Sequence, residues 1–120
     1  MAAREVVDLD AELGDTRPLW RDWLVDLGRR SRVRVDDLPD DRRAAATVLD
    51  ERVGNWRALL ERFAEEHAPL HFRPDPEVNA QLRALRSQGT QIVVSTDAPR
   101  ELAGIALAHL GLARIVQLDA

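Results

Sequence analysis

Two aspartates, Asp8 and Asp10, follow a short apolar stretch near the start of the chain. One carboxylate of such a pair can attack an electrophile such as phosphorus while the other delivers a proton to the leaving oxygen, provided that their environments differ. A strand over residues 5–10 would place both side chains on the same face, because strand residues two apart share a face. We therefore predict that Asp8 and Asp10 form an acidic catalytic pair.

A second polar group follows another apolar run. Residues 91–94 (Gln-Ile-Val-Val) predict a buried strand that ends at Ser95, Thr96 and Asp97. Because reactive groups of a parallel sheet collect at the carboxyl ends of its strands, both polar groups are expected to face one crevice. A helix from Pro99 would add free backbone amides, which suit an anionic phosphoryl group.

The remaining elements must position these strand ends. Helical spacing of apolar residues predicts an insert with helices over residues 17–28, 40–53 and 55–67, in which Thr16 or Asp15 caps the first helix and Gly28 ends it. Further helices are expected over 78–85 and 99–110, with a last strand over 114–118. This order predicts an α/β fold with a parallel sheet interrupted by a helical lid. The tryptophans at positions 20, 23 and 56 are expected to pack between the lid helices.

His67 and His71, with Glu65 and Glu66 before them, could in principle hold a metal ion. Pro69 lies between the two histidines and is expected to break the helical face that would align them. The sequence therefore favours no metal site in this segment.

Composition narrows the class of protein. The 120 residues are 45% hydrophobic and 32% charged, with a formal net charge of -4 and no cysteine. These values predict a globular cytoplasmic protein with no nucleic-acid partner, no membrane span and no secretory signal. All 17 basic residues are arginine, so no lysine ammonium is present to bind phosphate.

Three segments resemble one superfamily. Residues 6–16 (VVDLDAELGDT) look like the first motif of the haloacid-dehalogenase-like hydrolases, residues 92–102 are similar to their second motif, and residues 75–85 resemble the helix before it. The resemblance implies the branch that contains phosphoglycolate phosphatases and β-phosphoglucomutases. It predicts a partial Rossmann-like parallel sheet, formed by residues 1–16 and 73–120, with an inserted α-helical cap over residues 17–72.

The resemblance also implies roles for individual residues. Asp8 would be the nucleophile that forms an aspartyl phosphate, and Asp10 would be the general acid and base. Mg²⁺ would be held by Asp8 and by the backbone carbonyl of Asp10. Thr96 would bind the phosphoryl group, and the substrate site would be lined by Ala11, Glu12, Thr96 and Asp97. The substrate would be a small phosphomonoester, over which the cap closes.

The chain departs from the family pattern in several places. Ala11 replaces a glycine, and Glu12 and Asp97 add negative charge near the anion site. The cation of the third motif and the acidic pair of the fourth have no counterpart, which implies a member truncated at its carboxyl end. Arg17 and Arg100 are the predicted substitutes for the cation. The nucleophile strand would lie at an open sheet edge, where two copies could form a homodimer.

Two other functions stay open. The chain could be a catalytically impaired or silent fragment that serves as a binding or oligomerising module through its helical insert. It could also be an enzyme that moves a phosphoryl group within a sugar phosphate, as the mutases of the superfamily do.

Overall fold

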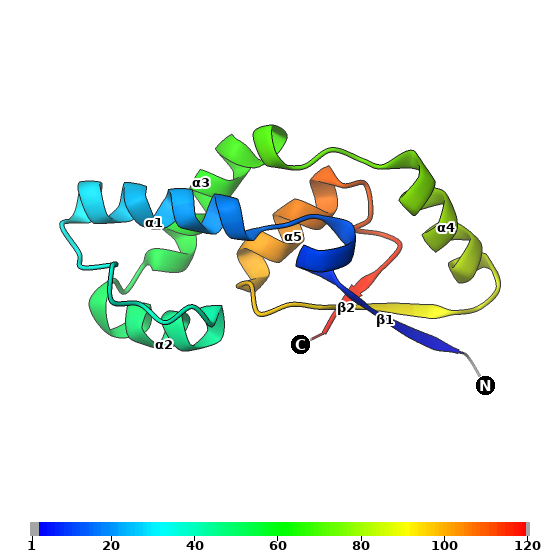
Figure 1. Cartoon of the computed structure of the whole chain (residues 1–120), viewed down its shortest axis with the longest axis horizontal. Helices are drawn as coiled ribbons and strands as arrows, with labels where there is room; N and C mark the ends of the chain where they lie inside the picture. The colour runs from blue at the N-terminus through cyan, green and yellow to red at the C-terminus, as the bar shows by residue number, and fades with distance from the viewer. Residues whose placement is uncertain (1–2, 120) are drawn as a thin grey trace.

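The computed structural model describes residues 3–119 and has a mixed α/β architecture (Figure 1). In chain order its elements are β1 (Arg4–Asp8), the short π-helical turn η1 (Leu9–Leu13), α1 (Arg17–Ser31), α2 (Arg42–Arg52), α3 (Trp56–His71), α4 (Pro76–Ser87), β2 (Gln91–Ser95), α5 (Arg100–His109) and β3 (Gln117–Leu118). The predicted order of strand, helical insert, helix, strand, helix and strand is confirmed, and so is the α/β fold class.

The three strands form one parallel sheet in the order β1, β2, β3. The register pairs Arg4 with Gln91 and Asp8 with Ser95, so β1 and β2 begin and end side by side. The last strand is shorter than predicted, because residues 113–115 form a turn in place of its first half. Within residues 3–119, β2 is therefore the central strand and β1 lies at an edge.

Helices cover one face of this sheet. Ile92 and Val94 point into the apolar core, whereas Val6, on the alternate face of β1, is 58% exposed. Figure 1 shows α4 and α5 on the same side of the strands. This arrangement follows from the alternation of side chains along a strand, since neighbouring residues face opposite sides of the sheet.

The helical insert is held together by its tryptophans. Trp20, Trp23 and Trp56 are 5%, 1% and 0% exposed, and the ring centroids of Trp23 and Trp56 are 6.0 Å apart. The predicted packing of these rings between lid helices is thus confirmed. Helix α3 also packs along α5, so the insert and the sheet layer share one apolar core and the insert is fixed against the strand ends.

Two predicted helix ends are wrong. Helix α1 continues through Gly28 to Ser31 and ends at Arg32, whose φ of 53° is left-handed. Helix α3 continues through Pro69 to His71. A proline in the last turn removes one hydrogen bond to a carbonyl four residues earlier, and exposed backbone near a helix end can replace that bond with water.

None of the helices within residues 3–119 has the length and apolar character needed to cross a bilayer.

Candidate functional site

Strand β1 ends at Asp8, and the chain turns at once into η1. Asp10 therefore lies outside the strand, and the prediction that Asp8 and Asp10 share one strand face is wrong. Asp8 caps the turn: its Oδ1 accepts a hydrogen bond from the Ala11 amide at 2.9 Å. The Glu12 carboxylate reaches back to the Asp8 amide at 2.5 Å. This reciprocal pattern stabilises the turn and leaves the Asp8 side chain exposed at the strand end.

Asp10 has a different environment. Its Oδ1 accepts hydrogen bonds from the Thr16 amide at 2.8 Å and from the Thr16 hydroxyl at 2.6 Å. Its Oδ2 forms an ion pair with the Arg42 guanidinium, and its side chain is only 14% exposed. The two aspartates thus differ in burial and in partners, as an acid and nucleophile pair requires.

The hydroxyl of Thr16 serves Asp10 and does not cap α1. The Asp15 carboxylate caps this helix instead, by accepting a hydrogen bond from the Arg17 amide at 3.0 Å. Of the two predicted caps, Asp15 is therefore the one that the structure uses.

Arg42, the first residue of α2, joins the helical insert to the strand ends. It is 2% exposed, and its Nη1 donates to the Thr16 hydroxyl at 2.7 Å. Its Nε donates to Asp97 Oδ1 at 2.9 Å, and its backbone amide donates to Asp97 Oδ2 at 3.0 Å. We call Asp10, Thr16, Arg42 and Asp97 the Arg42 cluster. A guanidinium can be buried when hydrogen-bond acceptors and opposite charges replace the water that it loses. Here Asp10, Thr16 and Asp97 provide those acceptors.

Two effects on the pKa of Asp97 oppose each other. Its burial acts to raise its pKa, but hydrogen bonds from the backbone and guanidinium of Arg42 outweigh burial and hold the pKa of Asp97 below its usual range. A carboxyl group whose pKa is lower in the folded than in the unfolded state stabilises the fold above its unfolded pKa of about 3.9 and loses that contribution as the pH falls.

The lowered pKa of Asp97 predicts that its contribution to the free energy of unfolding is lost in acid. We expect Asp97→Asn to lower the free energy of unfolding above about pH 5, and we expect the difference from the unmodified protein to shrink below about pH 4. Urea unfolding at a series of pH values measures this difference. Asp22→Asn, at a side chain that is 63% exposed, is the control. A difference for Asp97→Asn that stays constant down to about pH 3 would contradict the assignment.

The buried cation at this site, Arg42, is not among the predicted ones. Arg17 is exposed and pairs with Asp15 at 2.8 Å, and the nearby charges of Asp10 and Asp8 also act to raise the pKa of Arg17. Arg100 lines a hollow beside Thr96. Arg42 was not predicted because it lies in a run of four charged residues, 40–43, at the start of a helix, where charged side chains are usually exposed. Their charges gave no sign that one guanidinium among them is buried.

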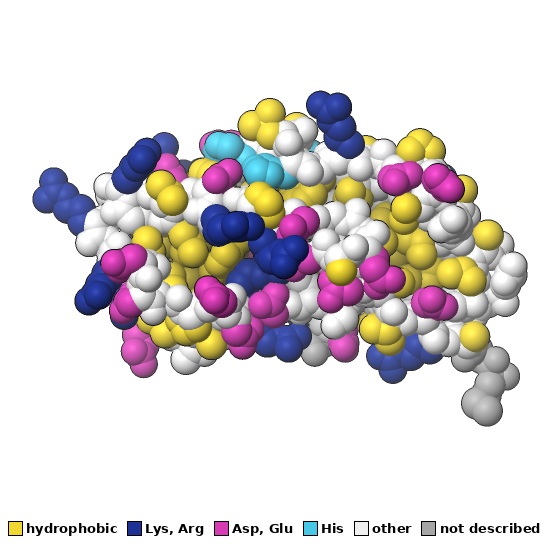
Figure 2. Space-filling model, in the orientation of Figure 1, with side chains coloured by type: hydrophobic (Ala, Val, Ile, Leu, Met, Phe, Trp, Pro, Cys, Tyr) yellow, Lys and Arg dark blue, Asp and Glu magenta, His cyan; other side chains and the backbone are white. Residues whose placement is uncertain are grey.

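Thr96 and Asp97 border a hollow of about 330 Å³ between α2 and the start of α5. The hydroxyl oxygen of Thr96 accepts a hydrogen bond from the Ala98 amide at 3.0 Å, which leaves its proton available to a ligand. Neither Asp8 nor Asp10 lines this hollow. In Figure 2, acidic and basic side chains lie next to one another across the middle of this face of the molecule.

The predicted site residues therefore fall into two groups. Asp10 and Asp97 meet through Arg42, and Asp8 meets Ala11 and Glu12 within the turn. The parallel register places the two groups side by side, because Asp8 pairs with Ser95 and Thr96 is the next residue. The structure thus brings both groups to the carboxyl end of the sheet.

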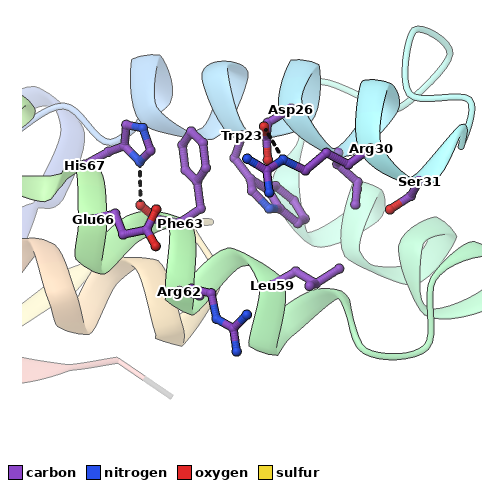
Figure 3. A pocket seen from close by; sticks show the side chains of 10 residues that line it. Trp23, Asp26, Arg30, Ser31, Leu59, Arg62, Phe63, Glu66 and His67 are labelled. Atoms are coloured by element: carbon purple, nitrogen blue, oxygen red, sulfur yellow. Dashed lines mark hydrogen bonds and ion pairs between the residues drawn. The ribbon is translucent and has the colours of Figure 1, made fainter.

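A separate hollow of about 220 Å³ lies between α1 and α3, on the helical insert. Figure 3 shows Trp23, Phe63 and His67 on its wall. The rings of Phe63 and His67 are stacked at 3.9 Å, and His67 Nδ1 bonds to the Phe63 carbonyl oxygen at 2.9 Å. None of the predicted site residues lines this hollow, so it is not part of the strand-end site.

A metal ion would find few ligands at the strand ends. Among residues 3–119, no group of three or more acidic, histidine or cysteine side chains is arranged to hold a metal ion. Mg²⁺ can bind through one or two protein oxygens together with water and substrate phosphate. Asp8 and the backbone carbonyl of Asp10 could provide two oxygens, whereas the Asp10 carboxylate is committed to Thr16 and Arg42.

Comparison of the chain with models of protein families, with curated proteins and with solved structures gave no match.

Proposed function

We propose that the protein is a phosphohydrolase of the haloacid-dehalogenase-like type, acting on a small phosphomonoester with Mg²⁺. The observation that supports this proposal is the position of Asp8. Its exposed carboxylate lies beside Ser95 at the end of β2, and Thr96 is the residue that follows Ser95. A nucleophile, a hydroxyl donor and a second, differently placed carboxylate then lie at one end of a parallel sheet, where α/β proteins bind ligands.

In the proposed reaction, an oxygen of Asp8 attacks phosphorus, and the bond between phosphorus and the leaving oxygen breaks. Asp10 gives a proton to that oxygen. Water then attacks the aspartyl phosphate, Asp10 takes a proton from this water, and inorganic phosphate leaves as Asp8 is restored. Thr96 donates its hydroxyl proton in a hydrogen bond to the phosphoryl group. Bound Mg²⁺ would neutralise charge on the phosphoryl oxygens.

The contact between Arg42 and Asp10 stands in the way of the proton transfers proposed for Asp10. Three donors, two from Thr16 and one from Arg42, point at the Asp10 carboxylate. These contacts engage both oxygens of Asp10, so neither oxygen is free to exchange a proton with a leaving group or with water. The proposal therefore requires that Arg42 leaves Asp10 when substrate binds, through movement of α2 relative to the strand ends.

The first test is turnover. We expect the purified 120-residue chain to release p-nitrophenol from p-nitrophenyl phosphate in the presence of Mg²⁺. Removal of the metal with EDTA is expected to stop the release, and added Mg²⁺ is expected to restore it. Release that is unaffected by EDTA would contradict the Mg²⁺ requirement, and absence of any release with Mg²⁺ would contradict the phosphohydrolase proposal.

A silent binding module is the second candidate, and the Arg42 cluster favours it. In that case the buried ion pairs have a purely structural role: they lock the helical insert onto the sheet. The assay distinguishes the two candidates, since a silent module gives no turnover while its fold remains intact by circular dichroism.

A further inference from the structure

The edge strand β1 carries unused backbone groups. Gln91, the register partner of Arg4, donates its amide to the Ala3 carbonyl at 2.8 Å. In a parallel ladder this pattern directs every second residue of β1 toward β2. The amides and carbonyls of Arg4, Val6 and Asp8 therefore point away from the sheet, toward the open edge. Glu12 occupies the Asp8 amide, and the Asp8 carbonyl begins the hydrogen bonding of η1. Within residues 3–119, the amides and carbonyls of Arg4 and Val6 have no backbone partner and remain for another strand.

The side chains of the same residues form a complementary strip. Val6, at the middle of β1, is 58% exposed. Arg4 precedes it by two residues, and Asp8 follows it by two, with the Glu12 carboxylate held at the Asp8 amide. The strip therefore has a cation at one end, an exposed apolar residue at the centre and two anions at the other end. A strand that runs antiparallel to β1 and carries the same sequence matches this pattern.

We propose that two copies of the chain associate through antiparallel pairing of their β1 strands, with Val6 opposite Val6 of the second copy. This register places Arg4 of each copy opposite Asp8 of the other. Pairing centred on Glu5 would set like charges opposite each other, and pairing centred on Val7 would leave Arg4 beyond the partner strand. A dimer with this twofold axis joins the two parallel sheets into one continuous sheet and closes the open edge.

The pairing also bears on the proposed phosphohydrolase, and this step rests on that function. Arg4 of the second copy would lie beside Asp8, the proposed nucleophile, because directly opposed side chains have Cβ atoms about 4.5–5.5 Å apart. A guanidinium at this position would supply positive charge from outside the chain. The association itself is measured without turnover, so its failure and the failure of the phosphohydrolase proposal are distinguishable.

A single introduced cysteine tests the register. The chain has no cysteine, and hydrogen-bonded residues in antiparallel strands have Cα atoms about 5.5 Å apart, within the range of about 4.4–6.8 Å that a disulfide spans. We expect Val6→Cys to form a disulfide-linked dimer under mild oxidation. Val25→Cys, on α1 at a side chain that is 52% exposed, is the control. Equal rates of crosslinking for the two variants would overturn the proposal.

Charge reversal tests the ion pairs. Sedimentation equilibrium is expected to show a concentration-dependent dimer of the unmodified chain. Arg4→Asp alone and Asp8→Arg alone are each expected to weaken association on the order of tenfold. The double variant restores opposite charges across the axis and is expected to associate like the unmodified chain. A monomer at every concentration, or a double variant that is weaker than both single variants, would overturn the register.

Discussion

Asp8→Asn is expected to reduce turnover of p-nitrophenyl phosphate by at least about a thousandfold, because an amide oxygen is a poor nucleophile and cannot form the covalent intermediate. The fold should survive the change. The side-chain carbonyl oxygen of the introduced asparagine can still accept the hydrogen bond that Asp8 Oδ1 accepts from the Ala11 amide. Initial rates at saturating Mg²⁺, together with thermal unfolding of both proteins, measure the two effects separately.

Asp36→Asn is the matched control for this experiment. The Asp36 side chain is 80% exposed and pairs with the exposed Arg34, so its replacement should leave the rate unchanged. If Asp8→Asn retains the rate of the unmodified chain, Asp8 is not the nucleophile. If Asp8→Asn loses the rate, loss of the turn at η1 does not explain the loss, because the side-chain carbonyl oxygen of the asparagine still accepts the hydrogen bond from the Ala11 amide.

Arg42→Ala is expected to lower the free energy of unfolding by about 3–5 kcal/mol, because it leaves two carboxylates at a partly buried site without their shared cation. Asp10 would keep only the Thr16 hydrogen bonds, and Asp97 would keep only the bond from the backbone amide at the start of α2. Domains of this size have total stabilities of about 5–15 kcal/mol, so this is a large fraction. Chemical denaturation at pH 7 measures it.

Arg43→Ala provides the comparison at the neighbouring position. Arg43 is exposed and donates one hydrogen bond to the Thr96 carbonyl oxygen at 3.0 Å, so its loss should cost no more than about 1 kcal/mol. Arg42→Lys is expected to fall between the two, because an ammonium keeps the charge but cannot reproduce the planar fork that reaches Thr16 and both carboxylates. Similar losses for Arg42→Ala and Arg43→Ala would show that the Arg42 cluster does not hold the insert in place.

Local patterns in the sequence were sufficient for much of the fold. The apolar residues 92–94 predicted β2, because a strand buried on both sides needs consecutive apolar residues. Apolar residues at helical spacing, which include Trp20 and Trp23 in one helix and Trp56 in another, predicted the packed face of the insert. An apolar helix face is buried against some partner, so it can be predicted before that partner is known. The two groups of polar residues in the candidate site could also be predicted, because each group stands where an apolar strand pattern ends.

Other features depended on contacts between distant segments. The turn at η1 moves Asp10 out of the strand and toward Thr16, a rearrangement that the alternating pattern of residues 5–10 did not indicate. Helix α3 continues past Pro69 because Ala68 and Phe72 are buried in the core, while Leu70 in the last turn is 80% exposed and leaves the backbone there accessible to water.

The sequence by itself determined which residue types stand at the strand ends and that a parallel sheet would gather them. Only the tertiary structure decided that Arg42 is the cation there. Its partners, Asp10 and Asp97, lie 32 and 55 residues away along the chain. A charged side chain that is buried among such distant partners has the same local sequence pattern as a solvated one, because burial of a charge depends on the three-dimensional arrangement of its neighbours.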